Sequence, residues 1–87
     1  MERYELRVKP SVAKDLRPLP KADARRILAR IEALREGPRP TGSEKLSAQE
    51  LYRVRQGGYR ILYRIADGAL IVEIVRVGHR REGYRAP

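Results

Sequence analysis

Four arginines in the second half of the chain, Arg53, Arg55, Arg60 and Arg64, alternate with apolar residues. A guanidinium group is planar and permanently charged, and its fork of N–H donors matches the oxygens of a phosphate. When the 2′-hydroxyl of RNA attacks the neighbouring phosphate, a dianionic pentacoordinate species forms, and fixed guanidinium groups can stabilise it. These residue types therefore predict a phosphate-binding site with the charge that such a cleavage requires.

Two pairs of turn residues, Gly57-Gly58 and Asp67-Gly68, determine where these arginines lie. Each pair lies between runs of alternating apolar and polar residues, which is typical of a two-residue β-hairpin turn. With the first pair as a turn, Arg55 lies directly opposite Arg60. With the second pair as a turn, Ala66 pairs with Ala69, Tyr63 pairs with Val72 and Leu62 pairs with Glu73. The two turns predict an antiparallel three-stranded meander.

This register divides the strands into two faces, because directly paired residues point to the same side of a sheet. The arginine face carries the four arginines around Leu62, Ile71, Glu73 and Val75. Like charges directly opposite each other destabilise a sheet, so the pairing of Arg55 with Arg60 indicates an anionic ligand. The other face is apolar and is the predicted core, with Tyr52, Val54, Ile61, Tyr63, Ile65, Leu70, Val72 and Ile74.

The rest of the chain predicts an α+β fold of order β-α-α-β-β-β in a single domain, residues 1–87. Two N-terminal helices pack on one face of an antiparallel sheet and leave the arginine face open. Ser11 caps the first helix, and an apolar stripe that includes Leu28 marks the second. The connecting loop runs from Gly37 to Ala48. The predicted elements are strands at residues 4–8, 51–56, 59–66 and 69–77, a first helix at residues 11–17, and a second helix with Pro20 in its first turn and an apolar stripe from Ala24 to Leu34.

The composition narrows the class of protein. The net charge is +9, and every basic residue after Glu50 except the single histidine is an arginine, which indicates an anionic partner. There is no cysteine, no signal-peptide stretch and no apolar run of membrane-spanning length, so we expect a cytoplasmic protein that does not enter a membrane. No phosphate-binding glycine loop, metal-ligand spacing or nucleophile triad is present, and we expect no cofactor and no metal site.

Further candidates lie outside the central meander. Lys45 lies near the end of the connecting loop, and Arg64 could instead pair with Glu73 on the same face. The C-terminal segment adds candidate RNA contacts at His79 and Arg81. His79 is the only side chain whose ordinary pKa lies near neutrality, which also makes it a minor catalytic candidate.

Three stretches resemble the RelE/ParE toxin superfamily, and its RelE branch in particular. They are LYRVR at residues 51–55, GYRILY at residues 58–63 and VGHR at residues 77–80, the last followed by Tyr84. The resemblance covers nearly the whole chain and implies a RelE-like fold. The closing arginine and tyrosine are typical of the RelE-like ribonucleases.

The resemblance implies a ribosome-dependent endoribonuclease that cleaves mRNA in the A site through attack by the 2′-hydroxyl. By position, Arg53 and Arg55 match two basic residues, commonly lysines, that line the scissile phosphate. Arg60 matches the arginine that stabilises the transition state. Arg80 matches the basic residue on the leaving-group side, and Tyr84 the aromatic residue that orients the base. Arginine in place of lysine keeps the charge but removes a group that could act as a base.

The resemblance also implies partners: a cognate acidic antitoxin of the RelB type, the ribosome with its rRNA, and mRNA. The main alternative is a ParE-like inhibitor of DNA gyrase without nuclease activity, a branch that typically lacks the residues matching Arg80 and Tyr84. An RNA-binding module that does not cleave RNA and a decayed toxin that only pairs with its antitoxin are further alternatives.

Overall fold

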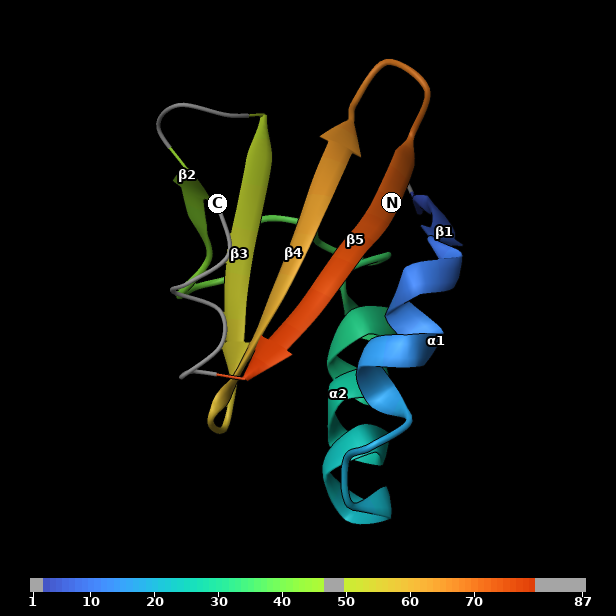
Figure 1. Cartoon of the computed structure of the whole chain (residues 1–87). Helices are drawn as coiled ribbons and strands as arrows, with labels where there is room; N and C mark the ends of the chain where they lie inside the picture. Colours follow the sequence, from blue (N-terminus) through green and yellow to red (C-terminus); the bar gives the residue numbers. More distant parts are fainter. Residues whose placement is uncertain (1–2, 47–49, 80–87) are drawn as a thin grey trace.

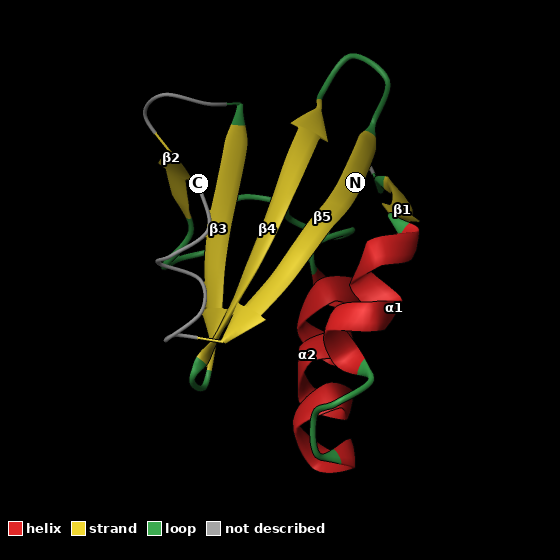
Figure 2. Cartoon of the chain, viewed as in Figure 1, coloured by secondary structure: helices red, strands yellow, loops and turns green. Residues whose placement is uncertain are grey.

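A computed structural model of the chain describes residues 3–46 and 50–79. Two helices pack against one face of a five-stranded sheet and leave the other face open (Figures 1 and 2). The α+β architecture predicted from the sequence is confirmed. The elements are β1 (Glu5–Val8), α1 (Pro10–Leu16), α2 (Lys21–Ala33), β2 (Glu44–Leu46), β3 (Leu51–Gln56), β4 (Tyr59–Ala66) and β5 (Ile71–His79).

The strand order in the sheet is β1-β5-β4-β3-β2. The first strand runs parallel to β5, whereas the other neighbouring strands are antiparallel. Strand β2 lies in the stretch predicted to be a loop, and it has only three residues, too few to show an alternating pattern. The last strand continues past Gly78 to His79 because both residues still pair with β4.

The β3–β4 hairpin has the predicted register. Arg55 pairs with Arg60, and Arg53 pairs with Leu62. Gly57 has a φ of 62°, a left-handed conformation that glycine adopts without a steric penalty. The glycine turn therefore sets the relative positions of these arginines, as the sequence indicates.

The predicted register of β4 and β5 is wrong. Residues 67–70 form a four-residue turn instead of a two-residue one, closed by a 3.2 Å hydrogen bond from the Leu70 N–H to the Asp67 carbonyl. The Leu70 carbonyl also accepts a 2.7 Å hydrogen bond from the N–H of Glu5, which ties the turn to β1. A second irregularity, between Leu62 and Tyr63, shifts the register again farther along the strands.

The core lies between the helices and the apolar face of the sheet. Most of the predicted core is confirmed, but Leu70 is only partly buried because it belongs to the turn, and Leu28 is 49% exposed because it lies beside the buried stripe of α2. Helix α1 begins at Pro10, before the predicted cap Ser11, and no side chain caps it. The buried core residues are Val12, Ile27, Ile31, Leu34, Val54, Ile61, Tyr63, Val72, Ile74 and Val77.

Helix α1 covers the part of β5 that β1 does not reach. The parallel pairing ends at Ile74, so the N–H groups farther along this edge of β5 lack a strand partner. The carboxylate of Asp15 accepts a 3.0 Å hydrogen bond from the N–H of Val77. The contact satisfies a backbone donor and fixes β5 against α1.

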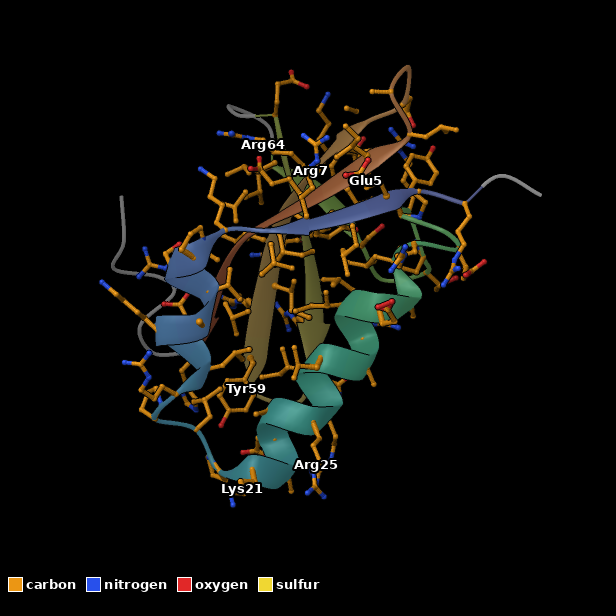
Figure 3. The ribbon with its side chains drawn as sticks, turned by 90° about the vertical axis from the view of Figure 1, so that its right-hand side faces the viewer. Glu5, Arg7, Lys21, Arg25, Tyr59 and Arg64 are labelled. Carbon is orange, nitrogen blue, oxygen red and sulfur yellow. The ribbon has the colours of Figure 1, made fainter. Side chains whose placement is uncertain are left out.

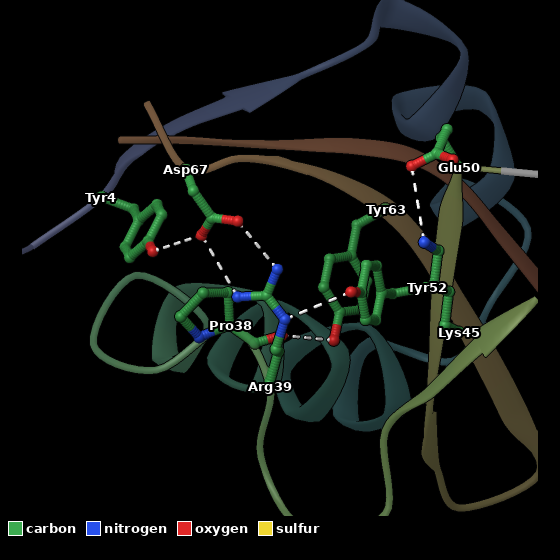
Figure 4. A network of polar contacts seen from close by, with 8 residues as sticks. All are labelled: Tyr4, Pro38, Arg39, Lys45, Glu50, Tyr52, Tyr63 and Asp67. Carbon is green, nitrogen blue, oxygen red and sulfur yellow. Dashed lines mark hydrogen bonds and ion pairs between the residues drawn. The ribbon is translucent and has the colours of Figure 1, made fainter. Parts of the chain in front are cut away.

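A polar network ties the N-terminal segment and the loop after α2 to the β4–β5 turn (Figure 4). Arg39 donates two hydrogen bonds to the carboxylate of Asp67, at 2.9 and 3.2 Å, and a third to the hydroxyl of Tyr52 at 3.2 Å. The Tyr4 hydroxyl donates to the same carboxylate at 2.8 Å. Hydrogen bonds from Arg39 and Tyr4 therefore hold the pKa of Asp67 below its ordinary value.

We expect this network to make folding stability depend on pH in the acid range. A carboxylate with a depressed pKa stabilises the fold above its unfolded pKa of about 4, and this contribution is lost as the pH falls through the lower folded value. Asp67→Asn removes the contribution, so the stability of the variant should differ most from the wild type at neutral pH and approach it in acid. Urea unfolding between pH 2 and pH 7 measures both curves. A gap that stays constant with pH would contradict the role of the Asp67 charge.

Candidate functional site

The open face of the sheet carries a row of side chains that crosses four strands. Arg53 pairs with Glu44 on one side and with Leu62 on the other, and Leu62 pairs with Arg76. Leu62 lies between two fully buried neighbours in β4 whose side chains point to the helices. The row therefore points away from the helices, with positive charge on both sides of one apolar residue.

A second row lies nearer the β3–β4 turn. Arg55 pairs with Arg60, as the turn predicts, and Arg60 pairs with Gly78. Arg55 is exposed, whereas Arg60 is only 6% exposed and is the one buried charged residue in the part of the chain that the structure describes. Because arginine does not lose its proton, the burial of Arg60 keeps a positive charge beneath the arginine face. We call Arg53, Arg55 and Arg60 the arginine clamp.

An acidic residue contacts the clamp from the edge of the sheet. The carboxylate of Glu44 forms an ion pair with the guanidinium of Arg53, whose side chain is 22% exposed. These two residues, together with Gly42, Ser43 and Arg55, line a hollow of about 340 Å³. Sequence reasoning missed Glu44 because it treated this stretch as a loop.

We expect the Glu44 carboxylate to compete with phosphate for Arg53. An ion pair with an exposed partner contributes about 0.2–1 kcal/mol, so Glu44→Gln should tighten RNA binding by roughly two- to fivefold and change stability little. A titration of labelled RNA at low salt measures the affinity. Glu5→Gln, which removes a carboxylate paired with Arg7 on β1, is the matched control. Weaker binding by the Glu44 variant would contradict the competition.

Arg64 lies on the same face but opposite an acid. It pairs with Glu73, and the side-chain nitrogen and oxygen are 3.9 Å apart. Glu73 also pairs with Arg7 of β1, and Figure 3 shows Arg64 and Arg7 at one end of the molecule, away from Tyr59 and α2. The charge of Arg64 is therefore partly neutralised. This is the pairing with Glu73 that the sequence analysis left open as an alternative.

Two candidates lie on the helix side of the sheet. Lys45 pairs with Tyr52, and its ammonium group lies 3.7 Å from the carboxylate of Glu50. His79 pairs with Tyr59, and its ring meets the Tyr59 ring edge-on with 5.1 Å between centroids. His79 lies on the opposite side of the sheet from the clamp, because β5 continues through Gly78 and alternation turns His79 toward the helices.

Helix α2 contributes side chains to the surroundings of His79. The Tyr59 hydroxyl donates a 2.8 Å hydrogen bond to Asp23, and this bond raises the pKa of Tyr59. Arg26 pairs with the same carboxylate at 3.3 Å. Gln56 and the turn residues complete a hollow of about 450 Å³ at this end of the molecule. The predicted site residues Arg80, Arg81 and Tyr84 lie outside the described residues.

Within residues 3–46 and 50–79, no group of three or more histidine, aspartate or glutamate side chains has an arrangement that would hold a metal ion. In the same ranges, no helix has both the length and the apolar character needed to span a bilayer.

Comparison with known proteins assigns the chain to a family. Residues 6–84 match the family described as the ParE toxin of the type II toxin-antitoxin system parDE. The chain is also 27% identical to toxin RelE1 of Methanocaldococcus jannaschii over 89 residues, which cover 98% of this chain and 99% of that protein. This chain belongs to the RelE/ParE toxin superfamily. It is therefore related to toxins of type II toxin-antitoxin systems.

Solved structures place it in the RelE-like branch of the superfamily. The RelE chain in the RelE–RelB complex of Pyrococcus horikoshii is 31% identical, with a TM-score of 0.80 over 90% of this chain and 96% of that one. The RelBE2 toxin-antitoxin complex of Mycobacterium tuberculosis contains a chain that is 33% identical, with a TM-score of 0.65 over 90% of this chain and 99% of that one. The sequence-based assignment to this branch is confirmed.

Proposed function

We propose that this RelE-like toxin is a ribosome-dependent endoribonuclease that cleaves mRNA in the A site. The observation that carries the proposal is the arginine clamp: Arg55 lies directly opposite Arg60, with Arg53 two residues away on the same face. The pairing places two guanidinium groups side by side on one face of the sheet. A phosphate bound at the clamp is attracted by both groups.

The clamp suits a cleavage in which the RNA supplies its own nucleophile. The 2′-hydroxyl attacks the adjacent phosphorus, the bond to the 5′-oxygen of the next nucleotide breaks, and a 2′,3′-cyclic phosphate and a 5′-hydroxyl remain. Negative charge increases on the phosphate oxygens in the transition state, where preorganised guanidinium groups stabilise it more than in the ground state. Arg53, Arg55 and Arg60 supply this charge, whereas proton transfer requires other groups.

The charge of the chain also suits a ribosomal substrate. A net charge of +9 on 87 residues attracts RNA over the whole surface and speeds the encounter at low salt. Exposed basic residues on α2, among them Lys21 and Arg25, add positive charge at the end of the molecule away from Arg64 (Figure 3). We place this activity in the cytoplasm, where mRNA and ribosomes meet.

The proposed regulator is an acidic antitoxin of the RelB type. The relatives of known structure from P. horikoshii and M. tuberculosis are toxin-antitoxin complexes. Carboxylates of such a partner would bind the arginine face as Glu44 binds Arg53, and would exclude phosphate from it. This binding should weaken as salt rises.

Primer extension on a defined mRNA, with and without programmed ribosomes, tests the activity. We expect cuts within the A-site codon that require the ribosome and disappear when the nucleotide 5′ of the scissile phosphate carries a 2′-deoxyribose. Cleavage of the deoxy substrate would exclude the 2′-hydroxyl mechanism. Equal cleavage of free RNA would exclude the dependence on the ribosome.

A second candidate is inhibition of DNA gyrase without nuclease activity, because the matched family is described by its ParE toxins. A supercoiling assay with purified gyrase distinguishes the two functions. Inhibition of supercoiling together with intact mRNA on programmed ribosomes would establish this alternative in place of the proposed one.

A further inference from the structure

The irregularity in the β4–β5 ladder changes which side chains β5 presents on the arginine face. Tyr63 pairs with Ile74, but its neighbour Leu62 pairs with Arg76, so Val75 is an additional residue on β5. An unbroken ladder from the same point would place Val75 opposite Leu62 and turn Arg76 toward the helices. The insertion of one residue is a β-bulge, a feature that re-aims side chains and is over-represented beside active sites.

The burial of Val77 and the exposure of Arg76 agree with this change of face. Val77 is 4% exposed and belongs to the core, whereas Arg76 is exposed. Since successive side chains of a strand point to opposite faces, a buried Val77 places Arg76 on the arginine face. The next residue on that face is Gly78, opposite Arg60. The bulge thus brings Arg76 beside the arginine clamp.

A contact from outside the sheet helps to hold Arg76 in this position. Asp15 of α1 accepts the hydrogen bond from the N–H of Val77, directly after Arg76 in the chain. Within the described residues, no strand lies beside this part of β5 on the edge away from β4, because β1 ends its pairing at Ile74. Together with the pairing to β4, Asp15 therefore holds β5 in the register beyond the bulge.

Arg76 differs from Arg53 and Arg64, two other arginines of this face, in its lack of an acidic partner within the described residues. Arg53 is paired with Glu44 and Arg64 with Glu73, whereas in the described ranges the guanidinium of Arg76 forms no ion pair. Its Cα lies two strand spacings from that of Arg53, about 10 Å. Two long side chains at that separation can hold successive phosphates of one RNA strand.

We propose that Arg76 is a further RNA-binding residue of this toxin. Its guanidinium holds a phosphate adjacent to the scissile one at the arginine clamp, and Asp15 is the positioning residue that keeps Arg76 on this face. The inference rests on the proposed function for the identity of its ligand, an RNA strand. It extends the substrate contact across β5, a strand to which sequence reasoning assigned no RNA contact before His79.

The test measures binding without turnover. The probe is a programmed ribosome whose A-site codon carries a 2′-deoxyribose at the scissile nucleotide, and the same mRNA free in solution is a second probe. Arg76→Ala should weaken binding on the order of tenfold at low salt and reduce the salt slope by about 0.7, the value for one phosphate contact to a single strand. Arg76→Lys should retain the slope.

Arg17→Ala is the matched control, because Arg17 is exposed at the end of α1 and its loss changes the net charge equally. We expect its affinity to change less than twofold. Equal losses in the two variants would overturn the proposal, since the effect would then be one of net charge. Binding by Arg76→Ala equal to that of the wild type at all salt concentrations would also overturn it.

A second pair of variants tests the positioning role. Asp15→Asn keeps an oxygen that accepts the Val77 N–H, whereas Asp15→Ala does not. We expect Asp15→Ala to lose RNA affinity as Arg76→Ala does, and Asp15→Asn to retain it. Retained affinity in Asp15→Ala would overturn the role of Asp15.

If the wild type binds these RNAs with the expected slope but does not cleave, the proposed nuclease fails and the role of Arg76 in binding stands. If the wild type binds neither RNA probe, both are overturned.

Discussion

Replacement of Arg60 by glutamine is expected to reduce A-site cleavage about a hundred- to a thousandfold, the effect of removing one preorganised donor from a transition state. Arg60 is 6% exposed, so its charge is held in place and its surroundings are less polar than water. Charge interactions are stronger in such surroundings. Glutamine is shorter and uncharged, and it cannot follow the increase in negative charge on the phosphate oxygens.

Single-turnover cleavage with saturating toxin separates this effect from weaker binding. Arg64→Gln is the matched control, because it removes an arginine from the same strand and face that is already paired with Glu73. We expect that variant to stay within about fivefold of the wild type. Urea unfolding of both variants shows whether the fold is retained. A folded Arg60→Gln protein that cleaves within threefold of the wild type would exclude Arg60 from the transition state.

The sequence alone was sufficient for the clamp because one turn determines it. Gly57-Gly58 is flanked by alternating residues on both sides, and a one-residue slip would move the whole apolar set out of the core. Only one register therefore buries the apolar side chains of β3 and β4. Arg53, Arg55 and Arg60 follow from that register by alternation, and the structure places all three as predicted.

The turn between β4 and β5 could not be predicted in the same way. Asp67-Gly68 resembles a two-residue turn, but the structure uses four residues, with Leu70 at a φ of 55°. A non-glycine residue at such a φ is uncommon, and the tie from Glu5 that accompanies it joins segments far apart in the sequence. The sequence pattern around the turn contains no record of that contact.

The bulge in β5 could not be predicted for the same reason, because the contact that accompanies it also joins segments far apart in the sequence. Val75, Arg76 and Val77 fit either face by composition, because one insertion exchanges a valine for another valine in the core. The contact that distinguishes the two arrangements comes from Asp15 in α1, 62 residues before Val77. Periodicity within a strand therefore could not assign Arg76 to the arginine face.

Replacement of Tyr63 by alanine is expected to have the largest effect on stability, about 3–5 kcal/mol. The side chain is fully buried at 0% exposure in the middle of the sheet, and its ring stacks on that of Tyr52 with 5.8 Å between centroids. Its hydroxyl donates a 2.7 Å hydrogen bond to the carbonyl of Pro38. Burial raises the pKa of Tyr63 and keeps the hydroxyl protonated as a donor.

The loss is large compared with the total stability of a small domain, typically 5–15 kcal/mol, so a considerable fraction of Tyr63→Ala molecules should be unfolded at 37 °C. Tyr63→Phe keeps the ring and leaves the Pro38 carbonyl without its donor, at about 1–2 kcal/mol. Urea unfolding of the three proteins separates the ring from the hydroxyl. Leu62 and Arg64 flank Tyr63 in β4, and only folded molecules present these side chains on the arginine face. The alanine variant should therefore also lose RNA affinity in proportion to its unfolded fraction. Equal losses of stability in the two variants would show that the hydrogen bond to Pro38, and not the ring, holds β4 in place.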